Sequence, residues 1–126
     1  MTGEDMGYAM ERIFSSGALD VFYTPIYMKK NRPGVKLTAL CRETELDQVE
    51  NAILRYTSTF GIRFYKADRK TLNREITRET TPWGEVSVKH GKLGDIHKFH
   101  AEADEVEKIA KEQDVLPSEV RKTLIQ

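Results

Sequence analysis

Residues 21–41 read VFYTPIYMKKNRPGVKLTALC, and this stretch decides the fold. Aromatic and branched residues fill its first part, Asp20 to Met28, and are typical of a strand. The segment Lys36 to Arg42 alternates apolar and polar residues and predicts a second strand. Between them, Asn31-Arg32-Pro33-Gly34 is a turn sequence. We therefore expect an antiparallel hairpin with Lys29, Lys30 and Arg32 at its tip.

A helical pattern precedes this hairpin and another follows it. Thr2 and Asp5 have the spacing of a capping box, which predicts a helix from the first residues to Ser15-Ser16-Gly17. Thr44 and Asp47 repeat that spacing before a second apolar stripe. The chain is therefore expected to begin with the order helix, strand, strand, helix.

The second half of the chain is expected to add strands and further helices. Residues 60–64 place Phe60, Ile62 and Phe64 on one face of a strand. A hairpin over 71–90 follows, with its turn at Thr81-Pro82-Trp83-Gly84 and with Trp83 covering its apolar side. Gly91 to Lys98 is expected to be a loop. Pro117 is well placed to begin the shorter of two closing helices.

This order of elements predicts an α+β fold with an antiparallel sheet. It is a ferredoxin-like arrangement lacking its first strand, with an added β-hairpin and C-terminal helices, because only Met1 precedes Thr2 where a βαββαβ unit has a strand. A chain of 126 residues has about the size of one domain. We therefore expect a single domain over 1–126, with its core over about 1–90 and a helical extension over about 101–126.

Composition favours a folded protein without a membrane span. Apolar residues make up 39% and charged residues 32% of the chain, unlike a disordered protein. No apolar run approaches the roughly 20 residues of a membrane helix, and no secretory signal opens the chain. We expect a cytoplasmic protein that has no membrane partner. The single cysteine, Cys41, excludes an intrachain disulfide and is expected to be a packing residue.

The formal net charge is zero, but the basic residues are clustered. Arginine forks and lysine point charges that converge are suited to binding the oxygens of a nucleoside triphosphate. For any one of them, a solvated surface charge is the simpler explanation. The candidate nucleotide-binding residues are Lys29, Lys30, Arg32, Lys36, Arg63 and Arg74.

Two further groups raise the question of metal binding. A divalent ion that bridges phosphates takes only one or two protein carboxylates, and Glu4 is the candidate ligand. The alternative for Glu4 is a carboxylate that favours the start of a helix. Imidazole suits nickel, so His90, His97 and His100 are candidate nickel ligands. Their place in or beside an expected loop favours surface residues, and we leave them outside the site.

The segment over residues 21–34, VFYTPIYMKKNRPG, closely resembles the LarC family of nickel insertion proteins. Met1-Thr2-Gly3-Glu4 resembles the end of another family motif. Phe60-Gly61-Ile62-Arg63 and Thr81-Pro82-Trp83-Gly84 fall where the family has similar segments. The resemblance covers most of the chain to about residue 90.

This resemblance implies a CTP-dependent nickel insertase (cyclometallase) of the lyase class. Such an enzyme inserts Ni²⁺ into pyridinium-3,5-bisthiocarboxylic acid mononucleotide and so completes the nickel-pincer nucleotide cofactor of lactate racemase. The family's carboxy-terminal region is implied to bind CTP with Mg²⁺ or Mn²⁺, and nickel is expected to bind mainly outside it. The expected partners are the amino-terminal part of the same insertase and further copies in a homo-oligomer. The upstream acidic residues of the first motif are absent, so we do not expect catalysis by this chain alone.

Two other functions remain open at this point. Basic strands with aromatic residues on a ferredoxin-like sheet are also used to bind single-stranded nucleic acid. The neutral net charge and the lack of an RNP-like motif argue against that function. The second alternative is a purely structural oligomerisation domain, in which subunits pair the edges of an incomplete sheet.

Overall fold

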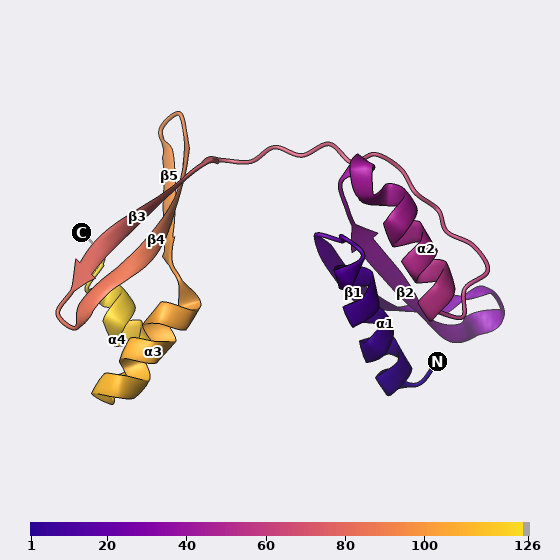
Figure 1. The fold of residues 1–126 in the computed structure, drawn as a ribbon, viewed down its shortest axis with the longest axis horizontal. Coiled ribbons are helices and arrows are strands. Elements are labelled where there is room, and N and C mark those ends of the chain that lie inside the picture. Colours follow the sequence, from indigo (N-terminus) through magenta and orange to yellow (C-terminus); the bar gives the residue numbers. More distant parts are fainter. Residues whose placement is uncertain (125–126) are drawn as a thin grey trace. The chain divides into compact units, whose positions relative to one another are not determined.

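A computed structural model describes residues 1–124 of the chain. The chain divides into two compact units, Met1–Lys66 and Ala67–Gln126, and each has its own cluster of buried apolar residues. Figure 1 shows the elements of both units. The expectation of one core over about 1–90 was therefore wrong. The second hairpin packs its apolar face against the helices that follow it, so the residues beyond about 101 belong to a core instead of extending one.

Unit 1 has the order helix, strand, strand, helix that the sequence predicts. Its first helix starts with the predicted capping box, in which Thr2 and Asp5 exchange hydrogen bonds of 2.9 and 3.1 Å. The bond from the Thr2 backbone N–H is the main reason why the pKa of Asp5 is lowered. The elements are α1 (Gly3–Ser15), β1 (Asp20–Met28), the 3₁₀ turn η1 (Lys29–Asn31), β2 (Arg32–Leu40), the 3₁₀ turn η2 (Glu43–Glu45) and α2 (Leu46–Tyr56).

The capping box predicted at Thr44 and Asp47 was wrong. Helix α2 begins at Leu46, one residue later than that motif requires, because η2 comes first and Glu45 occupies the N-cap without a side-chain cap. The Thr44 hydroxyl bonds the Glu45 carboxylate instead of a backbone N–H of the helix. Side chains of this type compete with helical capping by forming local bonds of their own.

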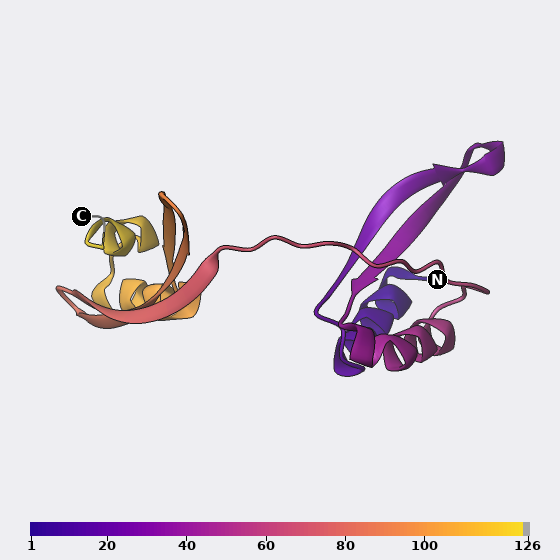
Figure 2. The same ribbon diagram turned by 90° about the horizontal axis from the view of Figure 1, so that it is seen from above.

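The register of the β1–β2 hairpin separates its residues onto two faces. Val21 pairs with Ala39 and Tyr23 with Leu37, and this face packs against α1 and α2. The core of unit 1 consists of residues from these elements: Ile13, Val21, Val49, Ala52 and Ile53. In Figure 2 the hairpin tip extends away from the two helices.

The strand predicted over residues 60–64 is not formed, because residues 57–72 adopt neither helix nor strand. In a complete ferredoxin-like sheet, the last strand pairs with the first one. Among the described residues β2 has β1 as its only strand neighbour, so nothing offers residues 60–64 a backbone to pair with. Ile62 still packs against the core of unit 1, whereas Phe60 is fully exposed.

Unit 2 contains a three-stranded antiparallel sheet in the order β3-β4-β5, followed by two helices. The predicted hairpin and both closing helices are confirmed. The loop predicted over Gly91 to Lys98 was wrong, because Gly91 and Lys98 pair across two strands and the turn is reduced to Gly94 and Asp95. The elements are β3 (Asn73–Thr81), β4 (Gly84–Leu93), β5 (Ile96–Ala101), α3 (Ala103–Gln113) and α4 (Pro117–Lys122).

The core of unit 2 lies between β4 and the two helices. Val86 and Val88 are buried, and they pack with Val106 of α3 and Val120 of α4. Trp83 is partly buried against this cluster, which confirms the expectation that it covers the apolar side of the hairpin. No helix among the described residues has the length and apolar character needed to cross a bilayer.

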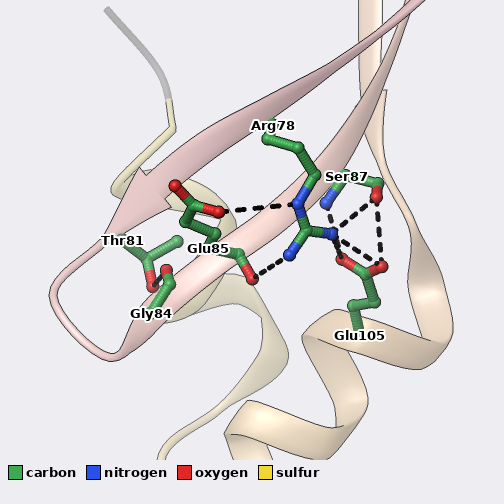
Figure 3. Close-up of polar contacts among 6 residues, drawn as sticks. All are labelled: Arg78, Thr81, Gly84, Glu85, Ser87 and Glu105. Carbon is green, nitrogen blue, oxygen red and sulfur yellow. Dashed lines mark hydrogen bonds and ion pairs between the residues drawn. The ribbon is translucent and has the colours of Figure 1, made fainter.

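A polar network fastens α3 to the sheet (Figure 3). The Glu105 carboxylate accepts hydrogen bonds from the Ser87 backbone N–H at 2.5 Å and from the Ser87 hydroxyl at 3.1 Å. The Arg78 guanidinium donates to both Glu105 oxygens at 3.2 Å. These contacts, the Ser87 backbone bond first, lower the pKa of Glu105. Arg78 therefore has a structural role in unit 2.

The separate cores predict separate responses to a core substitution. Ile13→Ala removes a fully buried side chain from unit 1 and should lower its stability by about 2–5 kcal/mol. Amide hydrogen exchange should then show lost protection in α1, β1, β2 and α2, with unchanged protection in β3 to α4. Equal loss of protection in both units would contradict this prediction.

The network around Glu105 predicts a pH-dependent stability of unit 2. Because the pKa of Glu105 is lower in the folded chain, its stabilising effect is complete above the unfolded pKa of about 4.3 and disappears as the pH falls through the folded value. Glu105→Gln should therefore lower the melting temperature at pH 7, and the difference from the unsubstituted chain should shrink below pH 4.3. Thermal unfolding followed by circular dichroism tests this, and a difference independent of pH would contradict it.

Candidate functional site

The tip of the β1–β2 hairpin concentrates positive charge. Lys29, Lys30 and Asn31 connect the paired residues Met28 and Arg32, and all of them are exposed. Three cations therefore stand within four consecutive positions on a short loop. Convergent ammonium and guanidinium groups of this kind suit an anion that has several oxygens.

The backbone of the tip is unusual for its sequence. Lys30 and Asn31 have φ values of 61° and 55°, in the left-handed region. Asparagine tolerates this conformation, but for lysine it costs roughly 1–2 kcal/mol. Strained backbone of this kind gathers at ligand-binding positions. Lys30 is thus held in a conformation that its own preferences do not explain.

Arg32 and Lys36 lie on the face of the hairpin that the helices do not cover. They pair with Met28 and Thr24, whereas the core-facing residues are those that pair with Val21 and Tyr23. Four residues along a strand span about 13 Å. Lys36 therefore continues the positive charge of the tip along the open face of the hairpin.

Gly34 serves side-chain packing on that same face. A Cβ atom at this position would lie 2.8 Å from the Met28 sulfur. The missing side chain therefore makes room for Met28.

The cations of the hairpin have no acidic partners in the part of the chain that the structure describes. Within residues 1–124, no ion pair includes Lys29, Lys30, Arg32 or Lys36. By contrast, Lys66 pairs with Glu43 at 3.2 Å. The charge at the tip is therefore free to attract an anion from solution.

The structure does not gather all of the predicted site residues. Arg63 lies in the segment after α2, exposed and without a hydrogen bond or ion pair to the hairpin among the described residues. Arg74 lies in β3 of unit 2, exposed. Glu4 lies exposed in the first turn of α1, where its neighbour Asp5 forms the cap. Only Lys29, Lys30, Arg32 and Lys36 are brought together by one element.

A shallow hollow between α1 and α2 brings together residues that the sequence did not single out. It has a volume of about 320 Å³ and is lined by residues that include Arg12, Asn51, Arg55 and Tyr56. Arg12 donates a hydrogen bond of 3.1 Å to the Tyr56 hydroxyl, and its guanidinium carbon lies 5.1 Å from that ring's centroid. This bond is the main cause that raises the pKa of Arg12. Two guanidinium groups make the hollow a second possible anion site.

Cys41 is a packing residue, as the sequence predicts. It is half-buried against the core of unit 1. Desolvation, followed by the charges of Glu45 and Glu50, raises the pKa of its thiol. A thiol in this environment resists the ionisation that a nucleophile needs.

The comparisons with known proteins agree with this architecture. The family model described as "Nickel insertion protein" matches residues 1–121. This chain belongs to the nickel insertion protein family. The carboxy-terminal domain of a cyclometallase, LarC2, which is involved in the synthesis of the NPN cofactor of lactate racemase, is a solved structure with a TM-score of 0.88 and 36% identity. The alignment covers 98% of this chain and 85% of that one. The α+β fold with antiparallel sheets is thereby established.

Curated relatives carry the name pyridinium-3,5-bisthiocarboxylic acid mononucleotide nickel insertion protein. The protein from Acetivibrio thermocellus is 45% identical over 95% of this chain and 30% of its own length. The one from Alkaliphilus metalliredigens is 40% identical over 88% of this chain and 26% of its own length. This nickel insertion family chain therefore spans about three tenths of the curated relatives that it matches.

The left-handed backbone of the hairpin tip predicts a stability difference between two glycine variants. Lys30→Gly removes the steric cost of a positive φ at lysine, and should raise the free energy of unfolding by up to about 1 kcal/mol. Asn31→Gly should change it less, because asparagine already tolerates this region. Urea unfolding measures both values. A clear loss of stability in Lys30→Gly would show that the side chain stabilises the tip in a way that the backbone does not reveal.

Proposed function

We propose that this chain is the carboxy-terminal CTP-binding part of a CTP-dependent nickel insertase of the lyase class. The complete protein would insert Ni²⁺ into pyridinium-3,5-bisthiocarboxylic acid mononucleotide and so complete the nickel-pincer nucleotide cofactor of lactate racemase. The names of its relatives support the reaction, and the relatives are about three times as long as this chain. The chain alone is therefore assigned binding and not the whole reaction.

The observation that carries the nucleotide-binding role is the unpaired positive charge of the hairpin tip. Lys29, Lys30 and Arg32 are exposed, within a few residues of one another, and free of acidic partners among the described residues. A triphosphate offers them several oxygens at close spacing. Lys36 extends this surface. Arg63 in unit 1 and Arg74 in unit 2 are further exposed candidates for phosphate binding, each on its own segment.

The divalent ion that accompanies the nucleotide needs few ligands from the protein. Mg²⁺ keeps several waters and is typically held by one or two carboxylates together with the phosphates. Glu4 offers an exposed carboxylate that is not used in the helix cap. Glu4 is thus the candidate ligand for Mg²⁺ or Mn²⁺, and the ion would neutralise phosphate charge there.

The remaining partners follow from the same proposal. The amino-terminal part of the insertase would supply the substrate site and the acidic residues of the first motif. Copies of this domain would form a homo-oligomer, since nucleotide sites are often built at interfaces that bring together charges from different segments. The reaction would take place in the cytoplasm.

Calorimetric titration of the chain with CTP, ATP, GTP and UTP, each with Mg²⁺ or Mn²⁺, tests this function. We expect metal-dependent binding that favours CTP. Lys30→Gly should weaken CTP binding about tenfold, because a charge-assisted hydrogen bond contributes about 1.5 kcal/mol or more. Asn31→Gly is the matched control, since it changes the same backbone without removing a charge, and Lys108→Gln removes an exposed charge elsewhere.

The other outcomes are equally specific. If Arg55→Gln weakens CTP binding and Lys30→Gly does not, the triphosphate binds in the hollow between α1 and α2. Binding of single-stranded RNA without binding of any triphosphate would favour the nucleic-acid function. If the chain binds neither but self-associates in sedimentation, it is an oligomerisation domain.

A further inference from the structure

We propose that His90 and His97 in unit 2 bind one divalent transition-metal ion between their imidazole rings. The two residues lie on neighbouring strands, β4 and β5, on the same face of the sheet. His90 pairs with Phe99, and His97 is two residues from Phe99 along β5. Side chains at such diagonal positions can reach one another.

The two rings face each other through nitrogen atoms. His90 Nδ1 and His97 Nε2 are 2.9 Å apart, and the ring centroids are 5.1 Å apart with planes inclined by 18°. The centroid separation is close to the nitrogen separation plus the radii of both rings, so the rings meet edge to edge. A proton between these nitrogens forms a hydrogen bond. A metal ion in its place forms one bond to each imidazole, and the displaced proton moves to the second ring nitrogen of His97 or to solvent.

A chain of hydrogen bonds fixes which nitrogen of His90 is free. The Thr77 hydroxyl donates a hydrogen bond of 3.1 Å to the Glu79 carboxylate. Thr77 must therefore accept from His90 Nε2, which lies 2.8 Å from the same hydroxyl. Nε2 then carries the proton of the ring, and Nδ1 presents a lone pair toward His97. Metal-binding histidines are typically fixed in this way by a partner on their second nitrogen.

The surroundings hold His90 in place while leaving His97 accessible. The His90 side chain is only 14% exposed, and Glu79 lies 3.6 Å from its Nε2. The Phe99 ring lies about equally far from both histidines, with centroids 6.2 and 6.1 Å away. His97 is exposed. One ligand is therefore fixed in advance, and the second can turn to meet an ion arriving from solution.

The distance between the nitrogens suits two adjacent positions around a metal ion. Ligands at right angles, each about 2.1 Å from an ion, lie about 3.0 Å apart. The observed 2.9 Å is close to that separation, so a turn of the exposed His97 ring directs its lone pair at an ion bound to His90 Nδ1. Within residues 1–124 no third metal-binding side chain joins the pair. Water or a small molecule would complete the coordination, and the ion would be exchangeable.

Imidazole is a good ligand for nickel, copper and zinc. This step rests on the proposed function, in which Ni²⁺ is the metal that the complete protein inserts. The histidine pair would then bind Ni²⁺ within this chain. This departs from the expectation that nickel binds mainly outside it. The metal site itself rests only on the geometry of His90 and His97.

Titration of the chain with NiCl₂, followed by calorimetry and by NMR of the histidine side chains, tests the proposal. We expect paramagnetic broadening of the His90 and His97 signals before those of His100. His97→Ala should weaken nickel binding tenfold or more. His100→Ala is the matched control, because His100 pairs with Lys89 and lies on the other face of β5; that variant should bind as the unsubstituted chain does.

The variant Thr77→Val tests whether the hydrogen bond to His90 prepares the histidine pair for metal binding. Valine keeps the shape and strand preference of threonine but removes the hydroxyl that fixes the His90 tautomer. Nickel affinity should fall about tenfold while circular dichroism stays unchanged. Equal nickel binding by the unsubstituted chain and His97→Ala would overturn the proposal and leave the pair as a hydrogen bond. CTP titration of the same samples keeps the two proposals separate, since His97→Ala should leave CTP binding intact.

Discussion

The register of the β1–β2 hairpin is the constraint on which unit 1 depends. Side chains alternate along a strand, so a shift by one residue would turn every side chain to the opposite face. In the observed register Val21, Leu37 and Ala39 meet the helices, while Arg32 and Lys36 stay on the open face. Burial of an unpaired cation is costly, and this cost enforces the same register that the apolar residues favour. The register that forms the core therefore also places the basic residues on the exposed face.

The two cores give the molecule a different organisation from that of a single domain. Unit 1 buries Ile13 and Val49 between helices and hairpin, and unit 2 buries Val86 and Val106 between sheet and helices. Cores of this size leave little excess stability. Polar contacts that fasten a helix to a sheet, such as that between Glu105 and Ser87, therefore matter more than they would in a larger domain.

Several elements were predicted correctly from signals within a few adjacent residues, although the capping box expected at Thr44 was not. The capping box at Thr2, the first hairpin and the proline at the start of α4 are encoded in a few adjacent residues. The strand expected over 60–64 failed because a strand needs a partner that its own sequence cannot supply. The loop prediction over 91–98 was wrong because polar residues occupy both faces of this exposed part of the sheet, so the sequence lacks the apolar and polar alternation of a strand.

The candidate sites were also predictable only where their residues are close together in the sequence. Clustering along the chain indicated the cations from Lys29 to Lys36, since one hairpin carries them all. Arg12 and Tyr56 come from different helices, and no spacing in the sequence announces their contact. The sequence places His90 and His97 in or beside an expected loop, where no contact between them is predicted. Once β5 replaces that loop, the same two residues become neighbours.

Among the described residues, one edge of β2 has no strand partner, which gives the charged residues of β2 a second importance. A strand with unpaired backbone groups is a template for association with other chains, and lysine or arginine beside it acts as a gatekeeper against aggregation. Arg32 and Lys36 lie on this strand, beside exposed apolar residues such as Val35 and Leu40. The positions proposed for nucleotide binding are therefore also positions that protect the strand against aggregation. Neutral replacements there would narrow the range of concentrations at which the protein stays monodisperse.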